Sequence, residues 1–276
     1  MKNAWPVFRR EFTSYFVTPM GYVVVGVFAA IMGMGFTLQF VMYSWQSQAP
    51  SAYGLTAVPD FEEQMLAPFM IFCGFLIMFL GPLVTGRLLA EERHHGTMEL
   101  LLTHPLRDGE IIFGKYLAAL GMLAVMMSLL AVPSLMLIHF TDVEPAVLGM
   151  GALAVFLMGA AFLSWGLFIS AMANNQVTAG VLTFGLWFVF FILGKIGDGM
   201  PEKIATPSAW PTAVAHSVLF LYGILRGLVR ELPLDAHAAH MAQGVVEPRD
   251  IAYYLLFTAF FLFLTFRAFE SRRWRG

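Results

Sequence analysis

One stretch of the sequence comes close to a nucleotide-binding motif. Gly109-Glu-Ile-Ile-Phe-Gly-Lys-Tyr116 satisfies the first seven positions of the phosphate-binding loop Gly-x-x-x-x-Gly-Lys-Ser/Thr. In that loop the final hydroxyl binds Mg²⁺, and the loop follows a strand and opens a helix of a βαβ unit. Here the eighth residue is Tyr116, and the segment runs into a long apolar stretch. We therefore expect no nucleotide or metal cofactor to bind this chain, and no catalytic residue in it.

Histidines and serines offer two further sites that would do chemistry. The histidines that can be combined on paper into a metal site are His94, His95 and His104, and His237 with His240. Neither set is accompanied by cysteines or by carboxylates at a spacing typical of metal ligands. A dyad of Ser134 or Ser164 with His139 would make an intramembrane enzyme, but nothing in the sequence places an orienting group and oxyanion donors beside it. The histidines are expected to be satisfied by neighbouring groups or solvated, and no catalytic dyad is expected.

The elements that must position these residues are membrane helices. The 276 residues are 59% hydrophobic and 12% charged, whereas soluble domains are about 25% charged. A membrane-spanning helix needs roughly 20 apolar residues. Six runs approach that length: Gly21–Tyr43, Met65–Gly86, Tyr116–His139, Pro145–Ala173, Val177–Gly194 and Ile251–Phe269.

These runs are nearly free of charge. The first five contain no Asp, Glu, Lys or Arg, and the sixth contains Arg267 only at its end. An ion-coupled carrier normally places such groups inside its helices, so that class is disfavoured. Asn174-Asn175-Gln176 divides the uncharged stretch from Pro145 to Gly194 into a helical hairpin. Cys73 is the single cysteine, which excludes an intrachain disulfide, and we expect it to be buried as a small hydrophobic residue.

The distribution of basic residues predicts the orientation. Lys and Arg are absent from the loop after the first run and from the loop around Asp142. The basic residues gather before the first run (Lys2, Arg9, Arg10), between the second and third (Arg87, Arg93, Arg107, Lys115) and after the sixth (Arg272, Arg273, Arg275). By the positive-inside rule, both termini and the segment 87–110 are cytoplasmic.

Two further segments are expected to lie at the membrane surfaces. Within residues 1–20, Trp5, Phe8, Phe12, Tyr15 and Phe16 recur at helical spacing opposite Lys2, Arg9 and Arg10, which predicts an interfacial amphipathic helix. The alternative is a solvated tail. Residues 195–250 are expected to be external. Within them, Ala209–Leu225 is short and contains Pro211 and His216, which favours a re-entrant or interfacial element over a seventh span.

The segment 87–110 is unusual for a loop between membrane helices. Arg87–His95 is predicted to extend the second helix, and Gly96 to end it. Thr97 can then cap a short apolar helix that ends at Pro105. The apolar residues are Met98, Leu100, Leu101 and Leu102, and the surrounding charges are Glu91, Glu92, Arg93 and Glu99. Such a surface usually meets a partner. Packing against the chain's own helices is the alternative.

The pattern Glu-Glu-x-x-x-Gly-Thr-x-Glu-Leu-Leu-Leu-Thr-x-Pro over Glu91–Pro105, followed by Gly114-Lys115-Tyr116, resembles the coupling segment of ABC-2 permeases. The first and last segments of the chain are similar to the branch containing the gliding-motility permease, whereas 198–248 matches only loosely. The resemblance implies one all-α transmembrane domain over 1–276, with six transmembrane helices, an N-terminal interfacial helix, a cytoplasmic coupling helix and the re-entrant or interfacial element between helices five and six.

The resemblance also implies partners and a location. The chain would be the permease subunit of an ABC exporter in a prokaryotic inner membrane, paired with a second permease, identical or different. Two ATPase subunits would bind ATP and Mg²⁺. The residues expected to contact an ATPase are Glu91, Glu92, Arg93, Gly96, Thr97, Glu99, Leu100, Leu101 and Pro105. The substrate is left open, and an anchor that transmits force to a surface or motility machine is the alternative function. No nucleic-acid partner is expected.

Overall fold

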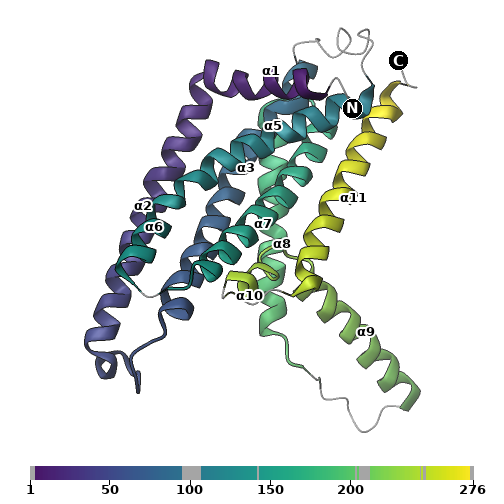
Figure 1. Cartoon of the computed structure of the whole chain (residues 1–276). Helices are drawn as coiled ribbons and strands as arrows, with labels where there is room; N and C mark the ends of the chain where they lie inside the picture. The colour runs from purple at the N-terminus through teal and green to yellow at the C-terminus, as the bar shows by residue number, and fades with distance from the viewer. Residues whose placement is uncertain are drawn as a thin grey trace.

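The structure, a computed structural model, describes residues 4–94, 107–141, 143–202, 204, 212–242, 244 and 247–273. All regular structure in these residues is helical (Figure 1), as predicted. The helices are α1 (Ala4–Val17), α2 (Pro19–Gln48), α3 (Ala67–His94), α5 (Asp108–Leu129), α6 (Ala131–Phe140), α7 (Pro145–Met172), α8 (Gln176–Gly199), α9 (Thr212–Glu231), α10 (Ala238–Ala242) and α11 (Pro248–Arg273). A short 3₁₀ helix, η1 (Pro50–Tyr53), lies between α2 and α3, and a π-helical turn, η2 (Glu62–Leu66), leads directly into α3.

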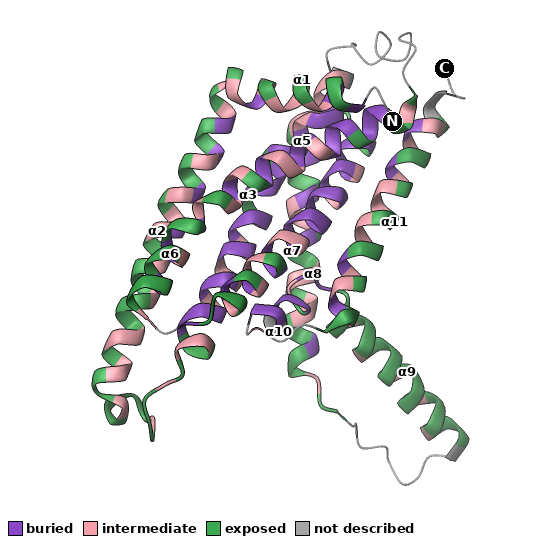
Figure 2. Ribbon diagram, viewed as in Figure 1, coloured by how far each residue is buried: buried purple, intermediate pink, exposed green. Residues whose placement is uncertain are grey.

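Seven segments of the described chain are long and apolar enough to cross a membrane. Five of them contain a predicted run and extend beyond its ends, and Pro145–Met172 matches the run Pro145–Ala173 except for its last residue. The seventh, Ala213–Glu231, lies in α9. None of its residues is buried, and α9 leans away from the bundle at the end opposite α1 (Figures 1 and 2). The six-span count and the re-entrant or interfacial placement of 209–225 stay predictions.

Helices α3 and α7 form the centre of the bundle, where the buried residues concentrate (Figure 2). Their backbones approach closely because glycines face bulkier partners. A Cβ atom added to Gly166 would lie 2.3 Å from Thr85 Oγ1, and one added to Gly81 would lie 2.6 Å from the Phe162 ring. Small residues at such crossings allow the van der Waals packing that holds membrane helices together. Cys73 is buried in this core, as predicted.

The third predicted run is not one continuous helix. It divides at Leu130 into α5 and α6. Pro133 explains the division, since proline has no N–H to donate to the Leu129 carbonyl and its ring crowds that oxygen. The predicted hairpin after α7 is confirmed: α7 ends at Met172, and Asn175 Oδ1 caps α8 by accepting a hydrogen bond of 2.7 Å from the Thr178 N–H.

Helix α1 lies across the end of the bundle, roughly perpendicular to α2 (Figure 1). Thr18 is extended, and Pro19 begins α2 at a position where a missing N–H costs nothing. The corner is tight: a Cβ atom added to Gly21 would lie 2.4 Å from the Tyr15 carbonyl oxygen. The chain therefore turns sharply between α1 and α2, and a side chain at Gly21 would collide with the backbone of α1.

The region between α9 and α11 enters the bundle at a different place from the one expected. Leu234, Ala238 and Met241 are buried in one apolar cluster with Met78 and Phe162 of the central helices. The short helix α10 thus packs against α7 and α3, whereas α9 stays exposed. Residues 209–211 lie outside the described chain.

Candidate functional site

The predicted coupling segment is described only at its two ends. Gly96, Thr97, Glu99, Leu100, Leu101 and Pro105 lie outside the described residues, as does the side chain of Arg93. Glu91 and Glu92 lie in the last turn of α3, and Asp108 begins α5. The contacts of these two helix ends therefore define the candidate site.

A buried lysine joins three helices at this end of the bundle. Lys115, on α5, has a side chain that is only 1% exposed. Its Nζ lies 2.9 Å from Glu92 Oε1 on α3 and 3.1 Å from Glu11 Oε1 on α1. It also donates to the Leu88 carbonyl at 2.5 Å. The three N–H donors of the ammonium group thus have three acceptors within reach, as a buried charge requires.

Arg10 completes a cluster of two cations and two carboxylates, which we call the α1 charge cluster (Arg10, Glu11, Glu92 and Lys115). Arg10 Nη2 donates to Glu92 Oε1 at 3.0 Å and to Glu11 Oε1 at 2.5 Å. Burial alone would raise the pKa of Glu11, but Lys115 and Arg10 outweigh it and hold that pKa below its usual value. Glu11 is therefore ionised at neutral pH.

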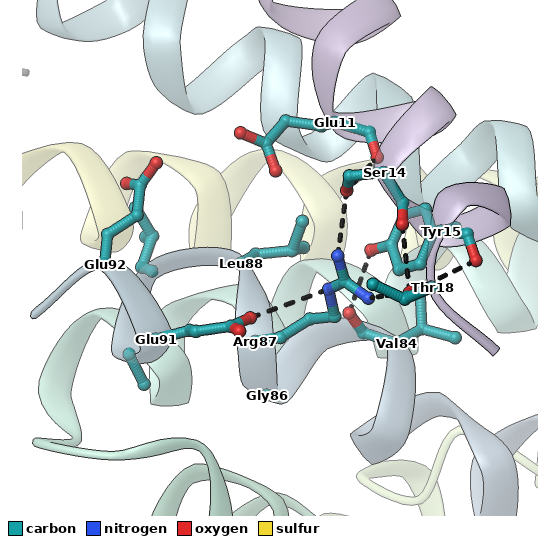
Figure 3. A network of polar contacts seen from close by, with 12 residues as sticks. Glu11, Ser14, Tyr15, Thr18, Val84, Gly86, Arg87, Leu88, Glu91 and Glu92 are labelled. Carbon is teal, nitrogen blue, oxygen red and sulfur yellow. Dashed lines mark hydrogen bonds and ion pairs between the residues drawn. The ribbon is translucent and has the colours of Figure 1, made fainter. Parts of the chain in front are cut away.

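A second set of contacts ties α1 to α3 one turn earlier (Figure 3). Arg87 donates to Ser14 Oγ at 2.8 Å and to Thr18 Oγ1 at 3.2 Å, and its guanidinium carbon lies 4.7 Å from the centre of the Tyr15 ring. The Tyr15 hydroxyl in turn donates to the Val84 carbonyl at 2.9 Å. Together with the α1 charge cluster, these bonds fix α1 to the last three turns of α3.

Helix α7 holds α3 from the other side. Ser170 Oγ accepts hydrogen bonds from the Leu89 and Ala90 N–H groups, each at 3.1 Å, and donates to the Gly86 carbonyl at 3.1 Å. Ser170 is fully buried. The end of α3 that leads into the predicted coupling segment is therefore held between α1 and α7.

Glycines let α1 approach α5 closely enough for this geometry. A Cβ atom added to Gly114 would lie 2.8 Å from Val7 Cβ and 2.9 Å from the Ala4 carbonyl oxygen. One added to Gly121 would lie 2.9 Å from the Phe12 ring. In the stretch that resembles a phosphate-binding loop, Gly114 thus makes close contact with α1, and Lys115 binds two carboxylates.

Comparison with known proteins identifies the family. A family model described as ABC-2 family transporter protein matches residues 5–274, nearly the whole chain. The chain belongs to the ABC-2 transporter family. With its apolar helices, this ABC-2 chain is a multi-pass membrane protein.

Two similar proteins are both named Probable ABC transporter permease protein NosY. The one from Pseudomonas aeruginosa is 30% identical over 167 residues, which cover 57% of this chain and 58% of that protein. The one from Stutzerimonas stutzeri is 24% identical over 201 residues, which cover 70% of this chain and 68% of that protein. The ABC-2 chain thus matches less than two thirds of the first protein's length.

The structure brings some predicted residues of the ABC-2 subunit into the cluster and leaves others at its edge. Glu92 Oε1 faces Lys115 and Arg10, and the Glu92 side chain is 17% exposed. The Glu91 side chain is 44% exposed and lies 3.7 Å from Arg87 Nε. Contact of either glutamate with an ATPase stays a prediction. Glu91 is the better placed of the two for an external partner.

Sequence reasoning missed Glu11 and the structural role of Lys115. A usable signal was present, because Lys115 stands at the start of a long uncharged run and follows a glycine. A lysine in that setting needs an acidic partner, but the sequence alone does not show which Asp or Glu provides it. Only the fold of the ABC-2 subunit, which lays α1 across α5, selects Glu11.

Proposed function

We propose that this ABC-2 permease subunit exports its substrate with energy from a separate ABC ATPase that docks on residues 97–103. The predicted contacts are Glu91, Glu92, Arg93, Gly96, Thr97, Glu99, Leu100, Leu101 and Pro105. Two ATPase copies, each binding ATP and Mg²⁺, would serve a pair of permease subunits. We also propose that the chain belongs to the branch of the family that contains the gliding-motility permease.

The observation that supports docking here is the anchoring of both ends of the segment. Glu92 lies just before it and Lys115 shortly after it, and their side chains are joined at 2.9 Å. The same lysine binds Glu11 of α1. A force applied to 97–103 would therefore be shared by α1, α3 and α5, because packed and hydrogen-bonded elements move as units.

The orientation follows from the basic residues and from the arrangement of the ends. Helix α1, the end of α3, the start of α5 and the end of α11 lie at the same end of the bundle (Figure 1). Most of the chain's clustered Lys and Arg belong to these segments, which favours the cytoplasmic side of a prokaryotic inner membrane for this end. In this orientation α1 lies in the cytoplasmic interface, and α9 lies on the external side as the interfacial element.

The decisive experiment is copurification with an ABC ATPase that associates with the parent chain when the two are coexpressed. Leu101→Asp places a charge in the middle of the apolar docking surface, and central interface positions typically carry a few kcal/mol. We expect it to abolish ATPase association while the chain still inserts in the membrane. Leu101→Met, which keeps apolar volume, is the matched control and should retain association. Undiminished ATPase binding and ATP-dependent activity in Leu101→Asp would show that the segment packs on its own bundle.

A further inference from the structure

Two cavities adjoin near the junction of α8, α9 and α11. One, of about 270 Å³, has aromatic walls from α7, α8 and α11. The other, of about 300 Å³, is lined mainly by charged side chains from the end of α8, the segment after α9 and the start of α11. Pro233 and Asp235 line both cavities. The two spaces are therefore neighbours with one wall in common.

The aromatic cavity is suited to a hydrocarbon chain. Trp165, Trp187, Phe257 and Phe261 are among its walls, and these rings pack against one another or against further aromatic rings. Trp165 also has a buried Nε1 that has no hydrogen-bond partner among the described residues. Aromatic walls of this kind bind apolar ligand groups, and a few polar atoms fix the orientation.

Two carboxylates that line the charged cavity, Asp235 and Asp250, each have a buried oxygen without a partner among the described residues. His237 is held in place by Asp250 Oδ1 at 2.8 Å, by the Glu231 carbonyl at 3.0 Å and by stacking on Tyr253. The other oxygen, Asp250 Oδ2, is buried without a partner in the described chain, on a side chain that is only 5% exposed. Leaving a buried charged acceptor unpaired is costly.

Asp235 repeats this feature at the wall between the cavities. Its Oδ1 is also buried without a partner in the part of the chain that the structure describes, and Lys195 lies 3.9 Å from its other oxygen. Burial raises the pKa of the Asp235 carboxyl because it disfavours the charged form. A donor brought to Oδ1 would stabilise the carboxylate.

The unpartnered oxygens indicate which charge a ligand head group in this cavity would carry. Both unpartnered oxygens are acceptors, and an ammonium group offers three donors and no acceptor. The carboxylates of this cavity also outnumber its Lys and Arg side chains, and Arg249 is already paired with Glu231. An anionic head group would meet Asp235 and Asp250 with like charge.

We propose that the two cavities form one binding site for an amphiphile with a protonated amine head group. The amine binds Asp235 and Asp250, and the hydrocarbon chain lies among the aromatic rings beside Trp165. The site is built by α7, α8, α11 and the segment after α9, so it does not depend on ATPase docking at residues 97–103.

Fluorescence quenching of the purified full-length chain in detergent tests this site. The probe is undecylamine with a terminal bromine, and the matched anionic probe is the corresponding bromoundecanoic acid. In a variant that keeps Trp165 and Trp187 as its only tryptophans, the amine should quench fluorescence saturably, at a concentration at least tenfold below that of the acid. This comparison needs no change in the cavity. Equal potency of the two probes, or quenching by neither, would overturn the proposal.

Substitutions then locate the head group. Asp235→Asn and Asp250→Asn should each weaken amine binding at least tenfold, in line with the loss of a hydrogen bond to a charged group. Asp198→Asn is the control, because this carboxylate lines the same cavity but is 58% exposed. It should change binding less than twofold. Amine binding that is unaltered by both cavity variants would refute the assignment.

Competition identifies the source of the amphiphile. Displacement of the probe by phosphatidylethanolamine, but not by phosphatidylglycerol, would assign the site to a membrane aminolipid. Retention of the amine-selective signal against both lipids would assign it to a single-chain amine. Displacement by phosphatidylglycerol alone would contradict the proposed charge.

Discussion

Replacing Lys115 with methionine should release α1 from the bundle. The substitution keeps the length of the side chain but removes an ammonium group that lies 2.9 and 3.1 Å from two carboxylates. Two unit charges at such a distance attract by about 5 kcal/mol at an effective dielectric constant of ~20. Removing one partner of a buried pair costs about 3–5 kcal/mol, because the other charge is left uncompensated. We expect α1 docking to weaken by about 3 kcal/mol.

A cysteine at Val7 can report this release. Val7 is buried against Gly114 at the α1–α5 contact. In a Cys73→Ser background, the Val7→Cys thiol should react with a maleimide only when α1 opens, so that the labelling rate follows the opening equilibrium. A loss of about 3 kcal/mol should raise that rate about a hundredfold, since each 1.4 kcal/mol is a factor of ten.

Two variants make the result specific. Lys195→Met removes a lysine whose side chain is 59% exposed and whose nearest carboxylate oxygens are 3.8 and 3.9 Å away. It should leave the labelling rate unchanged. Adding Glu11→Gln to Lys115→Met removes one of the two carboxylates that lost Lys115 as a partner. The double variant should therefore recover part of the protection of the Val7→Cys thiol from labelling. If Lys115→Met labels within twofold of the parent, the α1 charge cluster does not hold α1.

Three further predictions test the same end of the molecule and its orientation. Gly114→Val should raise labelling of the α1 reporter cysteine by about tenfold or more, because overpacking costs about 1–3 kcal/mol, whereas Gly109→Ala, with nothing within 4 Å of its added Cβ, should not. Folding lowers the pKa of Glu11, so the stability that this carboxylate contributes is complete above its usual pKa of 4.5 and is lost as the pH falls through the folded value. When the pH is lowered below 4.5, the midpoint temperature of thermal unfolding should therefore fall more steeply in the parent than in Glu11→Gln. A single cysteine at Ser51 should react with an impermeant reagent from outside, and one at Ser271 should not. Labelling of a cysteine at Ser271 from outside would mean that the C-terminal half has the opposite orientation in the membrane.

The spans were predictable because a bilayer imposes a simple length and polarity requirement. The six predicted runs lie mainly in helices, although the third is divided between α5 and α6, and Asn175 at the hairpin was visible as a polar interruption. The extension of α3 to His94 was predicted from the sequence of Arg87–His95. The contacts of Arg87 with α1 and with Glu91 were not predictable, because they exist only once the chain has folded. The break before α6 was foreseeable from Pro133.

The candidate site was predictable only as a location. The apolar segment after Glu92 stands out in the sequence, but the α1 charge cluster unites residues 11, 92 and 115, and no local pattern connects them. The same holds for the burial of Leu234 and Met241. Both belong to a stretch that is neither long nor apolar enough to attract notice, and they become buried because α10 packs against the central helices.

A charged contact gives α1 something that an apolar contact would not. The phenylalanine side chains of α1 would be stable against many apolar surfaces of the bundle or in lipid, so they do not fix its position. Buried ion pairs contribute little net stability, but a misplaced one is heavily penalised, and this can specify register. Glu92 and Lys115 border the predicted coupling segment, so a displacement of that segment would disturb the register of α1 as well. Lys115→Met, which leaves the predicted ATPase contacts in place, should therefore uncouple ATP hydrolysis from transport while leaving ATPase association intact, unlike Leu101→Asp, for which loss of association is expected.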